Sequence, residues 1–419
     1  MVAFDVPWPP STGHRQRLSA HVAALQELGE IDLFGIVPAG RAESCDVPPD
    51  AGLARVEAAR ERSPQPSPLL KAVGGTSLER PARFAELGGQ RLARAARTRL
   101  PVGVAPANVH KLRQAFRRFA RPPYDLVWFS RAEPYLQLGR PRVGPTVVDF
   151  EDLEHVKLQA MRAAILEQRP SGLSQGLRRR IRAEVTAVEA RRWRRAIEGV
   201  ARSADHLTAC SELDARRLGA YHVTVVPNGY DAPERPLGRL DVGSPPTVLL
   251  QGNLWYGPNL EAARILVTDI GPRLRALVPD VRIRLVGNRP PAVAALADPP
   301  GVTVVGVVPD MAPELAGADL IATPIPYGSG TRTKIVEAFA HRVPVVSSTV
   351  GAEGLDAEDG RHLLLADDPD SFAGACARLL ADIELRRRLT EAARRLFDER
   401  FESSQVRRAV IAAAVATSA

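Results

Sequence analysis

The sequence predicts an α/β protein made of two Rossmann-like units, and three observations support this fold class. Short apolar segments that favour strands alternate with longer amphipathic segments that favour helices. The alternation runs through two series, and a stretch rich in proline and glycine, 232–246, separates them. The chain has 419 residues, which is too many for one ordinary hydrophobic core. Strands that alternate with helices typically form a parallel sheet covered on both faces.

The first series begins with a strand at 2–6, a proline-rich loop at 7–13 and an amphipathic helix that ends near residue 29. One face of this helix carries Leu18, Val22, Leu25 and Leu28. Further strands are predicted at 31–37, 126–129, 146–150, 204–211 and 223–226. A Pro/Ser-rich surface stretch at 63–68, basic helices and a long charged helix over about 178–199 complete the series. We assign residues 1–210 to the first domain.

The second series has the same order of elements. Its strands are predicted at 247–250, 281–286, 302–305, 320–322 and 343–347. Its helices are predicted at 258–277, 332–340, 369–381 and 384–400. We assign residues 211–400 to the second domain, and we expect residues 401–419 to form a C-terminal helix that packs back on the first domain.

The net charge of the chain is concentrated in its first half. Residues 1–210 contain 33 Lys or Arg and 22 Asp or Glu, a net +11, whereas residues 211–419 contain 23 and 26, a net −3, which together give +8. Aromatic residues make up only 5% of the chain, so a base-stacking surface for nucleic acid is not indicated. The basic helical segments, which include Arg91, Arg94 and Arg97 and the runs 178–182 and 191–195, favour an anionic membrane surface. The alternative is a set of solvated helix faces in an arginine-rich chain.

Other features indicate a cytoplasmic protein. We also expect this protein to bind peripherally to the inner face of the plasma membrane. No apolar run reaches the length of about 18 residues that a membrane-spanning helix needs. The N-terminus lacks the basic and apolar regions of a signal peptide. The cysteines, Cys45, Cys210 and Cys376, are odd in number and have no metal-binding spacing, which is typical of a reducing compartment.

A glycine-rich segment at 323–338 carries the residues with the clearest chemistry. It lies between a predicted buried strand and a helix, where ligands bind in open α/β sheets. Gly328 and Gly330 let the backbone approach a phosphate, and the start of the helix favours an anion. Arg332 and Lys334 add positive charge, and Glu337 lies about one turn into the helix, where its carboxylate can accept hydrogen bonds from hydroxyl groups.

Two other phosphate-binding loops do not fit this segment. A Walker loop needs Lys followed by Ser or Thr after its second glycine, and no such sequence occurs here. The dinucleotide fingerprint needs a third glycine, and Thr333 stands at that place. The two glycines alone would also fit an ordinary tight turn, so the surrounding residues decide.

The run 327–355 resembles the family 4 glycosyltransferases in its Gly-Ser-Gly-Thr-Arg start and in its Pro-Val-Val-Ser-Ser-Thr-Val-Gly-Ala-Glu-Gly-Leu end. Shorter segments agree with the family in order and spacing, at 7–17, 226–231, 252–259 and 285–287. The resemblance implies the GT-B fold, in which two Rossmann-like domains face each other across a cleft. It also implies transfer with retention of anomeric configuration, with 1–210 binding the acceptor and 211–400 binding a nucleotide-sugar donor.

The resemblance also implies a set of site residues. The implied donor-binding residues are Gly13, Gly252, Asn253, Gly328, Gly330, Thr331, Arg332, Lys334 and Glu337. The implied catalytic residues are Lys334, Glu337 and Glu151.

The sequence departs from the family pattern at several of these places. Ser329 stands where the family often has a first glutamate, and Asn253 and Pro258 lie where an Arg/Lys pair usually binds the diphosphate. Glu151 occupies the place of a common catalytic histidine, and His155, four residues further on, is the alternative. Arg342 replaces a glycine that commonly ends the helix before 343–347, at a small conformational cost.

These features lead to one functional hypothesis, in which the chain moves a sugar from a nucleoside-diphosphate sugar to a glycan or lipid-linked acceptor in polysaccharide or glycoconjugate synthesis. No cofactor or metal is expected. Asp368-Pro369-Asp370 has the form of a metal motif, but we interpret it as a helix cap. The alternatives are a catalytically inactive carbohydrate-binding relative, which the missing glutamate and histidine would favour, and another sugar-nucleotide enzyme such as an epimerase.

Overall fold

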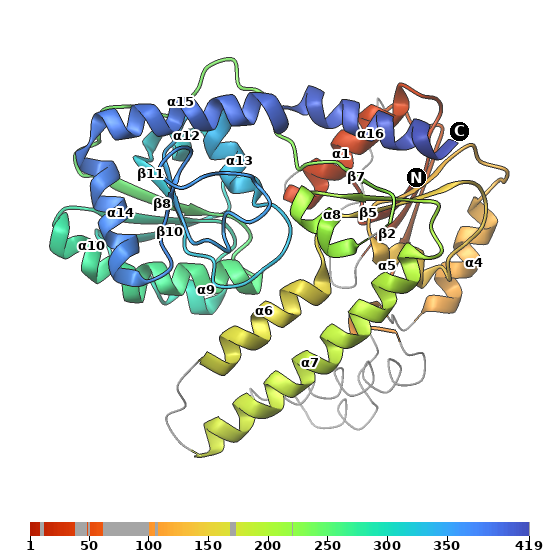
Figure 1. The fold of residues 1–419 in the computed structure, drawn as a ribbon, viewed down its shortest axis with the longest axis horizontal. Helices are drawn as coiled ribbons and strands as arrows, with labels where there is room; N and C mark the ends of the chain where they lie inside the picture. Colours follow the sequence, from red (N-terminus) through yellow and green to blue (C-terminus); the bar gives the residue numbers. More distant parts are fainter. Residues whose placement is uncertain are drawn as a thin grey trace. The chain divides into compact units, whose positions relative to one another are not determined.

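The computed structural model describes residues 1–8, 12–37, 48, 51–61, 100–104, 108–167, 173–219 and 221–418. The chain divides into two compact units, each with its own sheet (Figure 1). Unit 1 comprises Met1–Ala209, Ala215–Val225 and Arg407–Ala419, and unit 2 comprises Cys210–Asp214 and Val226–Val406. The predicted basic segment at 91–97 and the stretch at 63–68 lie outside the described residues.

Within the described residues, the sheet of unit 1 has seven parallel strands in the order β3-β2-β1-β4-β5-β6-β7. The strands are β1 (Val2–Phe4), β2 (Asp32–Val37), β3 (Arg55–Arg60), β4 (Val127–Phe129), β5 (Thr146–Phe150), β6 (His206–Ala209) and β7 (Val223–Val225). The central strands are almost wholly buried because helices cover the sheet, and Phe34, Trp128 and Phe129 fill its core. The helical elements are α1 (Gly13–Gln26), η1 (Val102–Val104), α4 (Val109–Phe119), α5 (Ala132–Gln137), α6 (Glu154–Glu167) and α7 (Leu173–Ala201). Two further helices, α8 (Glu212–Leu218) and α16 (Ser403–Ser418), each contain residues of both units.

The sheet of unit 2 has six parallel strands in the order β10-β9-β8-β11-β12-β13. The strands are β8 (Thr247–Gln251), β9 (Arg282–Val286), β10 (Val302–Gly306), β11 (Leu320–Thr323), β12 (Val345–Ser347) and β13 (Leu364–Leu365). The helical elements are α9 (Gly257–Ile265), η2 (Leu266–Ile270), α10 (Gly271–Leu277), α11 (Pro291–Ala294), α12 (Ala312–Gly317), α13 (Thr333–Ala340), α14 (Pro369–Ala381) and α15 (Ile383–Arg400). Aliphatic side chains of β8, β9 and β11 form the centre of the core.

Both sheets reverse their strand order at one point, between β1 and β4 in unit 1 and between β8 and β11 in unit 2. At such a point the loops after the two central strands leave in opposite directions, so a crevice opens at the carboxyl ends of the strands. The loop after β8 begins at Gly252, and the loop after β11 contains the glycine-rich segment. The topology therefore places the segment with the clearest chemistry at the edge where ligands bind.

Several element boundaries differ from those predicted. The edge strand β3 was not predicted because its sequence, Arg-Val-Glu-Ala-Ala-Arg, contains no strongly apolar run. Most of its residues are exposed. The helix expected over 258–277 is interrupted by the π-helical segment η2, which ends just before Pro272. A proline in a helix lacks an N–H and crowds the carbonyl four residues earlier, so the helical register changes there.

The sequence predicts one boundary between the domains at residue 210, whereas the chain passes between the two units more than once. Strand β7 pairs with β6 and completes the first sheet, so residues 215–225 belong to unit 1. Residues from Arg407 onward also belong to unit 1, where Arg407 pairs with Glu27 and Ser418 Oγ donates to the carbonyl of Asp125 over 3.4 Å. In the described part of the chain no helix is both long and apolar enough to cross a bilayer.

A buried arginine connects α15 to the rest of unit 2. Arg386 has no exposed surface, and its guanidinium donates to the backbone carbonyls of Asp319 at 3.0 Å, Leu379 at 3.2 Å and Arg239 at 2.8 Å. Asp319 is also buried, and its carboxylate accepts from the backbone N–H of Thr247 at 2.7 Å. Each of these polar groups would be costly to bury alone, so the network stabilises unit 2 as a whole.

Substitution Arg386→Met should therefore destabilise unit 2 by roughly 2–4 kcal/mol, because three backbone carbonyls, including those of the buried residues Asp319 and Leu379, lose their charged donor. The matched control is Arg387→Met, since Arg387 is the next residue and its ion pair with Glu384 is exposed. Surface pairs of this kind contribute little to stability. Urea unfolding followed by circular dichroism measures both variants, and equal unfolding midpoints would contradict the structural role of Arg386.

Candidate functional site

The carboxyl edge of the sheet in unit 2 is built from two glycines whose backbones lie very close together. Gly252 follows β8 with φ +134°, and Gly287 follows β9 with φ +143°. A Cβ atom on Gly287 would lie 1.8 Å from the carbonyl oxygen of Gly252. A Cβ atom on Gly252 would lie 3.2 Å from the Nζ atom of Lys334 and 3.2 Å from the Nδ2 atom of Asn259. Glycine is required at both positions, and the backbone of Gly252 consequently lies directly beside the lysine.

The glycine-rich loop is closed by the side chain of Arg332. Its Nη1 atom donates to the carbonyls of Ser329 at 2.6 Å and Gly330 at 2.8 Å. A Cβ atom on Gly328 would lie 2.2 Å from Nη2 of the same guanidinium, and Gly330 has φ +72°. Both glycines are therefore needed for the loop to fold around the guanidinium. The Nη2 atom of Arg332 and the Oγ atom of Ser329 are buried without a hydrogen-bond partner among the described residues.

Two other predicted donor-binding residues, Thr331 and Asn253, support the conformation of their own loops. The hydroxyl of Thr331 accepts from Asn228 Nδ2 over 2.8 Å, which ties the loop to the Asn-Gly-Tyr-Asp turn at 228–231. Asn253 is exposed, and its side-chain oxygen accepts from the backbone N–H of Trp255 over 3.1 Å, so it shapes the turn before α9.

Lys334 is a buried cation on the first turn of α13. Its Nζ atom donates to Asn259 Oδ1 over 2.8 Å. The pKa of Lys334 falls to about 7, chiefly because burial removes water from the ammonium group and further because Arg332 is nearby, while Glu337 opposes the shift. Two cations therefore lie close together, and the pair favours an anionic ligand.

Glu337 lies three residues after Lys334 on the same helix. Gln251 Nε2 donates to Glu337 Oε2 over 2.5 Å, and the Tyr230 hydroxyl also hydrogen-bonds this carboxylate. Burial raises the pKa of Glu337 to about 7, against the hydrogen bonds from Tyr230 and Gln251 and the charge of Lys334. The carboxylate is oriented by two donors and retains further lone pairs for a ligand.

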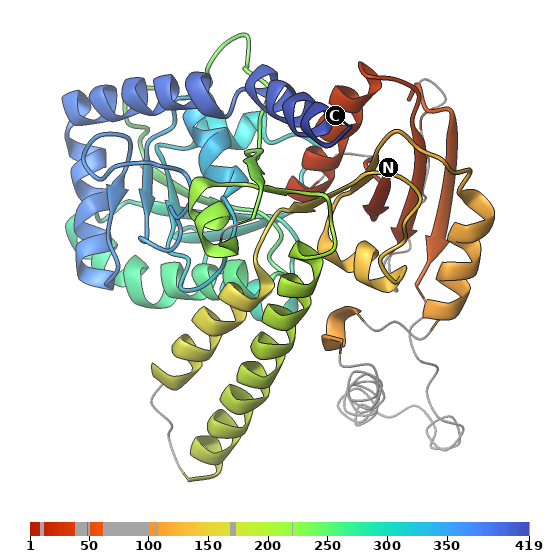
Figure 2. The same ribbon diagram turned by 45° about the vertical axis from the view of Figure 1, so that its right-hand side comes forward.

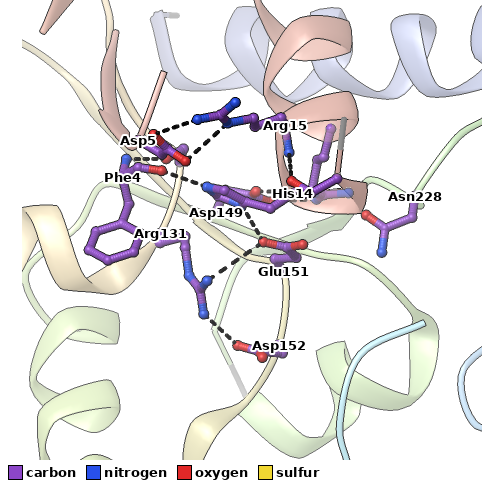
Figure 3. A network of polar contacts seen from close by, with 12 residues as sticks. Phe4, Asp5, His14, Arg15, Arg131, Asp149, Glu151, Asp152 and Asn228 are labelled. Carbon is purple, nitrogen blue, oxygen red and sulfur yellow. Dashed lines mark hydrogen bonds and ion pairs between the residues drawn. The ribbon is translucent and has the colours of Figure 1, made fainter. Parts of the chain in front are cut away.

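A second polar network lies at the switch point of unit 1, centred on His14 (Figure 3). His14 Nε2 lies 2.6 Å from the carbonyl oxygen of Phe4, and His14 Nδ1 lies 2.5 Å from Glu151 Oε2. Both ring nitrogens thus face oxygen atoms, one of a carboxylate and one of a backbone carbonyl. The pKa of the Glu151 carboxyl is lowered by His14 and Arg131, which together outweigh the effect of burial. Glu151 is therefore an ionised group that holds His14.

Further ion pairs surround this network. Arg131 Nη2 lies 3.1 Å from Asp152 Oδ1, and Arg131 Nη1 lies 4.0 Å from Glu151 Oε2 (Figure 3). Arg17 binds the buried Asp149 over 2.6 Å, and this arginine outweighs burial to lower the pKa of Asp149. The charges of unit 1 at this edge are mostly compensated by one another.

The structure brings most of the predicted donor-binding residues to one edge of unit 2. Those residues are Gly252, Asn253, Gly328, Gly330, Thr331, Arg332, Lys334 and Glu337. Gly13 and Glu151 lie in unit 1, where Gly13 is the first residue of α1 and directly precedes His14. His155 is the second residue of α6. Asp368 is a helix cap, as interpreted, since its side chain accepts from the N–H groups of Asp370 and Ser371 at the start of α14.

Sequence reasoning missed four residues that complete these networks: His14, Tyr230, Gln251 and Asn259. Three of them lie inside segments that the resemblance had marked, namely 7–17, 226–231 and 252–259. A polar residue within two positions of a glycine in each segment was the available signal. Gln251 ends a buried strand, and a buried polar residue at a strand end is a comparable signal.

Comparisons with known proteins agree with this geometry. Residues 245–382 match the model of a protein family described as "Glycosyl transferases group 1". An uncharacterized 44.6 kDa protein in the cps region of Klebsiella pneumoniae is 23% identical over 168 residues, which is 38% of this chain and 43% of that protein. The chain thus matches less than half the length of this curated relative.

Solved structures resemble the chain over nearly its whole length. Sucrose-phosphate synthase from Thermosynechococcus elongatus has a TM-score of 0.63 at 17% identity and covers 97% of this chain and 96% of its own. Anabaena HepE in complex with UDP-glucose has a TM-score of 0.59 at 16% identity, and the match covers 99% of this chain and 98% of the HepE chain. A glycosyltransferase from Rickettsia africae has a TM-score of 0.58 at 12% identity, and the match covers 99% of this chain and 98% of the Rickettsia chain.

The class of fold follows from these likenesses: the chain has the GT-B fold, which confirms the predicted fold class. Within that fold, residues 245–382 match the model of the group 1 glycosyl transferases, and they contain the edge around Lys334 and Glu337.

The paired pKa shifts predict a pH-dependent affinity for an isolated nucleoside diphosphate. Between pH 7 and 9 Lys334 loses its positive charge and Glu337 completes its ionisation, because both groups have a pKa of about 7. Both changes weaken attraction to a diphosphate, so UDP affinity should fall roughly tenfold or more over this range.

Isothermal titration with UDP measures this dependence, and Lys334→Met provides the comparison. That variant should bind UDP more weakly at pH 7 and show a flatter pH profile. A pH-independent affinity of the unmodified chain would show that the diphosphate does not lie beside these two residues.

Proposed function

We propose that this chain is a retaining glycosyltransferase of the family 4 type, which moves a sugar from a nucleoside-diphosphate donor to a glycan or lipid-linked acceptor. The donor binds unit 2 and the acceptor binds unit 1. Such transfers build polysaccharides and glycoconjugates, and the cps-region relative supports that setting.

The observation that carries the proposal is the buried, uncompensated charge at the start of α13. Lys334 and Arg332 lie near each other, and the one carboxylate that acts on Lys334, Glu337, has a pKa raised to about 7. A diphosphate would supply the missing negative charge, and glycine at residue 252 keeps a side chain from crowding Lys334. As the bond to the sugar breaks, charge grows on the diphosphate, so a fixed cation there stabilises the transition state.

Glu337 is assigned to the donor hydroxyl groups. Tyr230 and Gln251 hold its carboxylate in place, so binding requires little further ordering of the side chain. Sugar and ribose hydroxyls are donors that such a carboxylate accepts strongly. We assign UDP as the nucleotide, because HepE binds UDP-glucose and shares the fold over the whole chain.

In unit 1, Glu151 acts as a positioning residue, because its carboxylate is already engaged by His14 and Arg131. The remaining carboxylate oxygen would accept from an acceptor hydroxyl at this edge. We assign no metal to the reaction, since Lys334, Arg332 and backbone N–H groups can neutralise a diphosphate. The net positive charge of the first half of the chain supports a peripheral position at the anionic inner face of the plasma membrane.

A screen of UDP-, GDP- and ADP-sugars by thermal shift tests the donor assignment. We expect UDP-sugars to raise the melting temperature most, and we expect slow donor hydrolysis to continue in EDTA. Loss of hydrolysis in EDTA with recovery in Mg²⁺ or Mn²⁺ would contradict the metal-independent mechanism, and absence of any nucleotide-sugar effect would contradict the donor site.

Glu337→Gln and Lys334→Met should impair the enzyme in different ways. Glu337→Gln replaces a charged acceptor with a neutral one, and hydrogen bonds to charged groups contribute about 1.5–3 kcal/mol, so donor affinity should fall roughly 10- to 100-fold. Lys334→Met removes charge that matters more in the transition state, so kcat should fall on the order of 100-fold or more.

Steady-state kinetics and donor titration measure both variants, with circular dichroism as the folding control. Arg361→Met is the matched control for charge, because Arg361 is exposed and forms a surface ion pair with Glu358. Near-normal turnover by a folded Lys334→Met protein would remove Lys334 from the site.

A further inference from the structure

Helices α6 and α7 form a hairpin that runs away from the sheet of unit 1. Figures 1 and 2 both show the two helices side by side, with α7 the longer. Arg179 Nη1 donates to the carbonyl of Leu166 over 3.1 Å, and Arg162 pairs with Glu184 over 3.0 Å, so contacts between the helices continue along the hairpin.

Helix α7 has two opposite apolar faces. One face is buried in unit 1 and consists of Ala183, Ala187, Ala190, Trp193, Ile197 and Val200. The opposite face carries four large aliphatic side chains that remain exposed. They are Leu177 at 61%, Ile181 at 55%, Val185 at 53% and Val188 at 40% exposure. We call these four residues the α7 stripe.

The α7 stripe is continuous along the helix. Its members follow one another at intervals of four, four and three residues, which places them on one face within about 80° of the helix circumference. At a rise of about 1.5 Å per residue the stripe is roughly 16 Å long. Burial of α7 in its own unit does not explain the stripe, because the buried residues already supply the inward face.

Charges on α7 indicate which surface would cover the stripe. The helix contains eight arginines and three glutamates, a net charge of +5. Each glutamate has an arginine partner: Glu184 pairs with Arg162, Glu189 with Arg192, and Glu198 with Arg194. Arg178 and Arg180 are exposed at the two edges of the stripe. Two copies of this surface would repel each other, whereas an anionic surface would attract it.

We propose that the α7 stripe inserts into the boundary between headgroups and acyl chains of an anionic bilayer, with Arg178 and Arg180 on the lipid phosphates. An anionic bilayer binds helices that carry aliphatic residues on one face and arginines at the edges of that face. This proposal specifies the membrane contact in the proposed function, and it would place the lipid-linked acceptor close to unit 1.

Co-sedimentation of the full chain with vesicles tests the proposal. Vesicles of phosphatidylcholine with phosphatidylglycerol should bind the chain, and vesicles of phosphatidylcholine alone should bind it much more weakly. The double variant Ile181→Ser, Val185→Ser should lower the partition coefficient at least roughly tenfold, because both side chains lose their burial in the bilayer.

The matched control is the double variant Leu277→Ser, Ile383→Ser in unit 2, whose side chains are 58% and 47% exposed. It should bind vesicles like the unmodified chain. Arg178→Gln, Arg180→Gln should bind more weakly and with less dependence on salt. Equal binding by the stripe variant and the unmodified chain would overturn the proposal, as would no binding of the unmodified chain at low salt.

Two further measurements separate this proposal from its alternatives. UDP titration of the stripe variant should give the affinity of the unmodified chain, so a loss of vesicle binding alone concerns the membrane contact and leaves the donor site intact. Light scattering without vesicles should give the same mass for both proteins. A dimer that the stripe variant loses would overturn the proposal and identify a second copy as the occupant.

Discussion

A lysine buried beside an arginine is unfavourable unless something nearby supplies negative charge, and the edge of unit 2 is organised by this electrostatic constraint. Lys334 has one neutral hydrogen-bond partner, Asn259, and its charge is opposed by Arg332. The surrounding backbone adapts to it, since Gly252 adopts a conformation and a proximity that only glycine permits. The free protein thus holds a cationic site in place before any ligand arrives, and an anion would find its partners already oriented.

In unit 1, by contrast, the charged groups at the carboxyl edge of the sheet compensate one another. Its switch point also carries charged groups, but they have partners within one network: Glu151 contacts His14 and Arg131, and Asp149 pairs with Arg17. A self-compensated edge has little net attraction for an anion and offers oriented acceptors and donors for neutral hydroxyl groups. The two edges therefore suit two kinds of substrate, and this difference agrees with a donor on unit 2 and an acceptor on unit 1.

The sequence predicted the parts of the structure that depend on local patterns. Buried strands, amphipathic helices and the Asp368 cap follow from periodicity and capping chemistry, and the GT-B fold is confirmed. The edge strand β3 and the π-helical segment η2 were not predicted, because one lacks an apolar run and the other changes register inside an apolar helix. The roles of the candidate site residues stay predictions. Pairs such as His14 with Glu151 join residues 137 positions apart, and only the folded sheet brings them together.

The close approach of Gly252 and Gly287 has a consequence for how this edge can change over evolutionary time. A side chain at residue 287 would collide with the carbonyl of Gly252, so substitution there would displace the neighbouring loop as well as its own. A tolerated change at residue 287 would therefore require remodelling of two loops that come from different strands. Homologous chains should therefore vary on the exposed faces of the helices around unit 2 while glycine is retained at the position of Gly287.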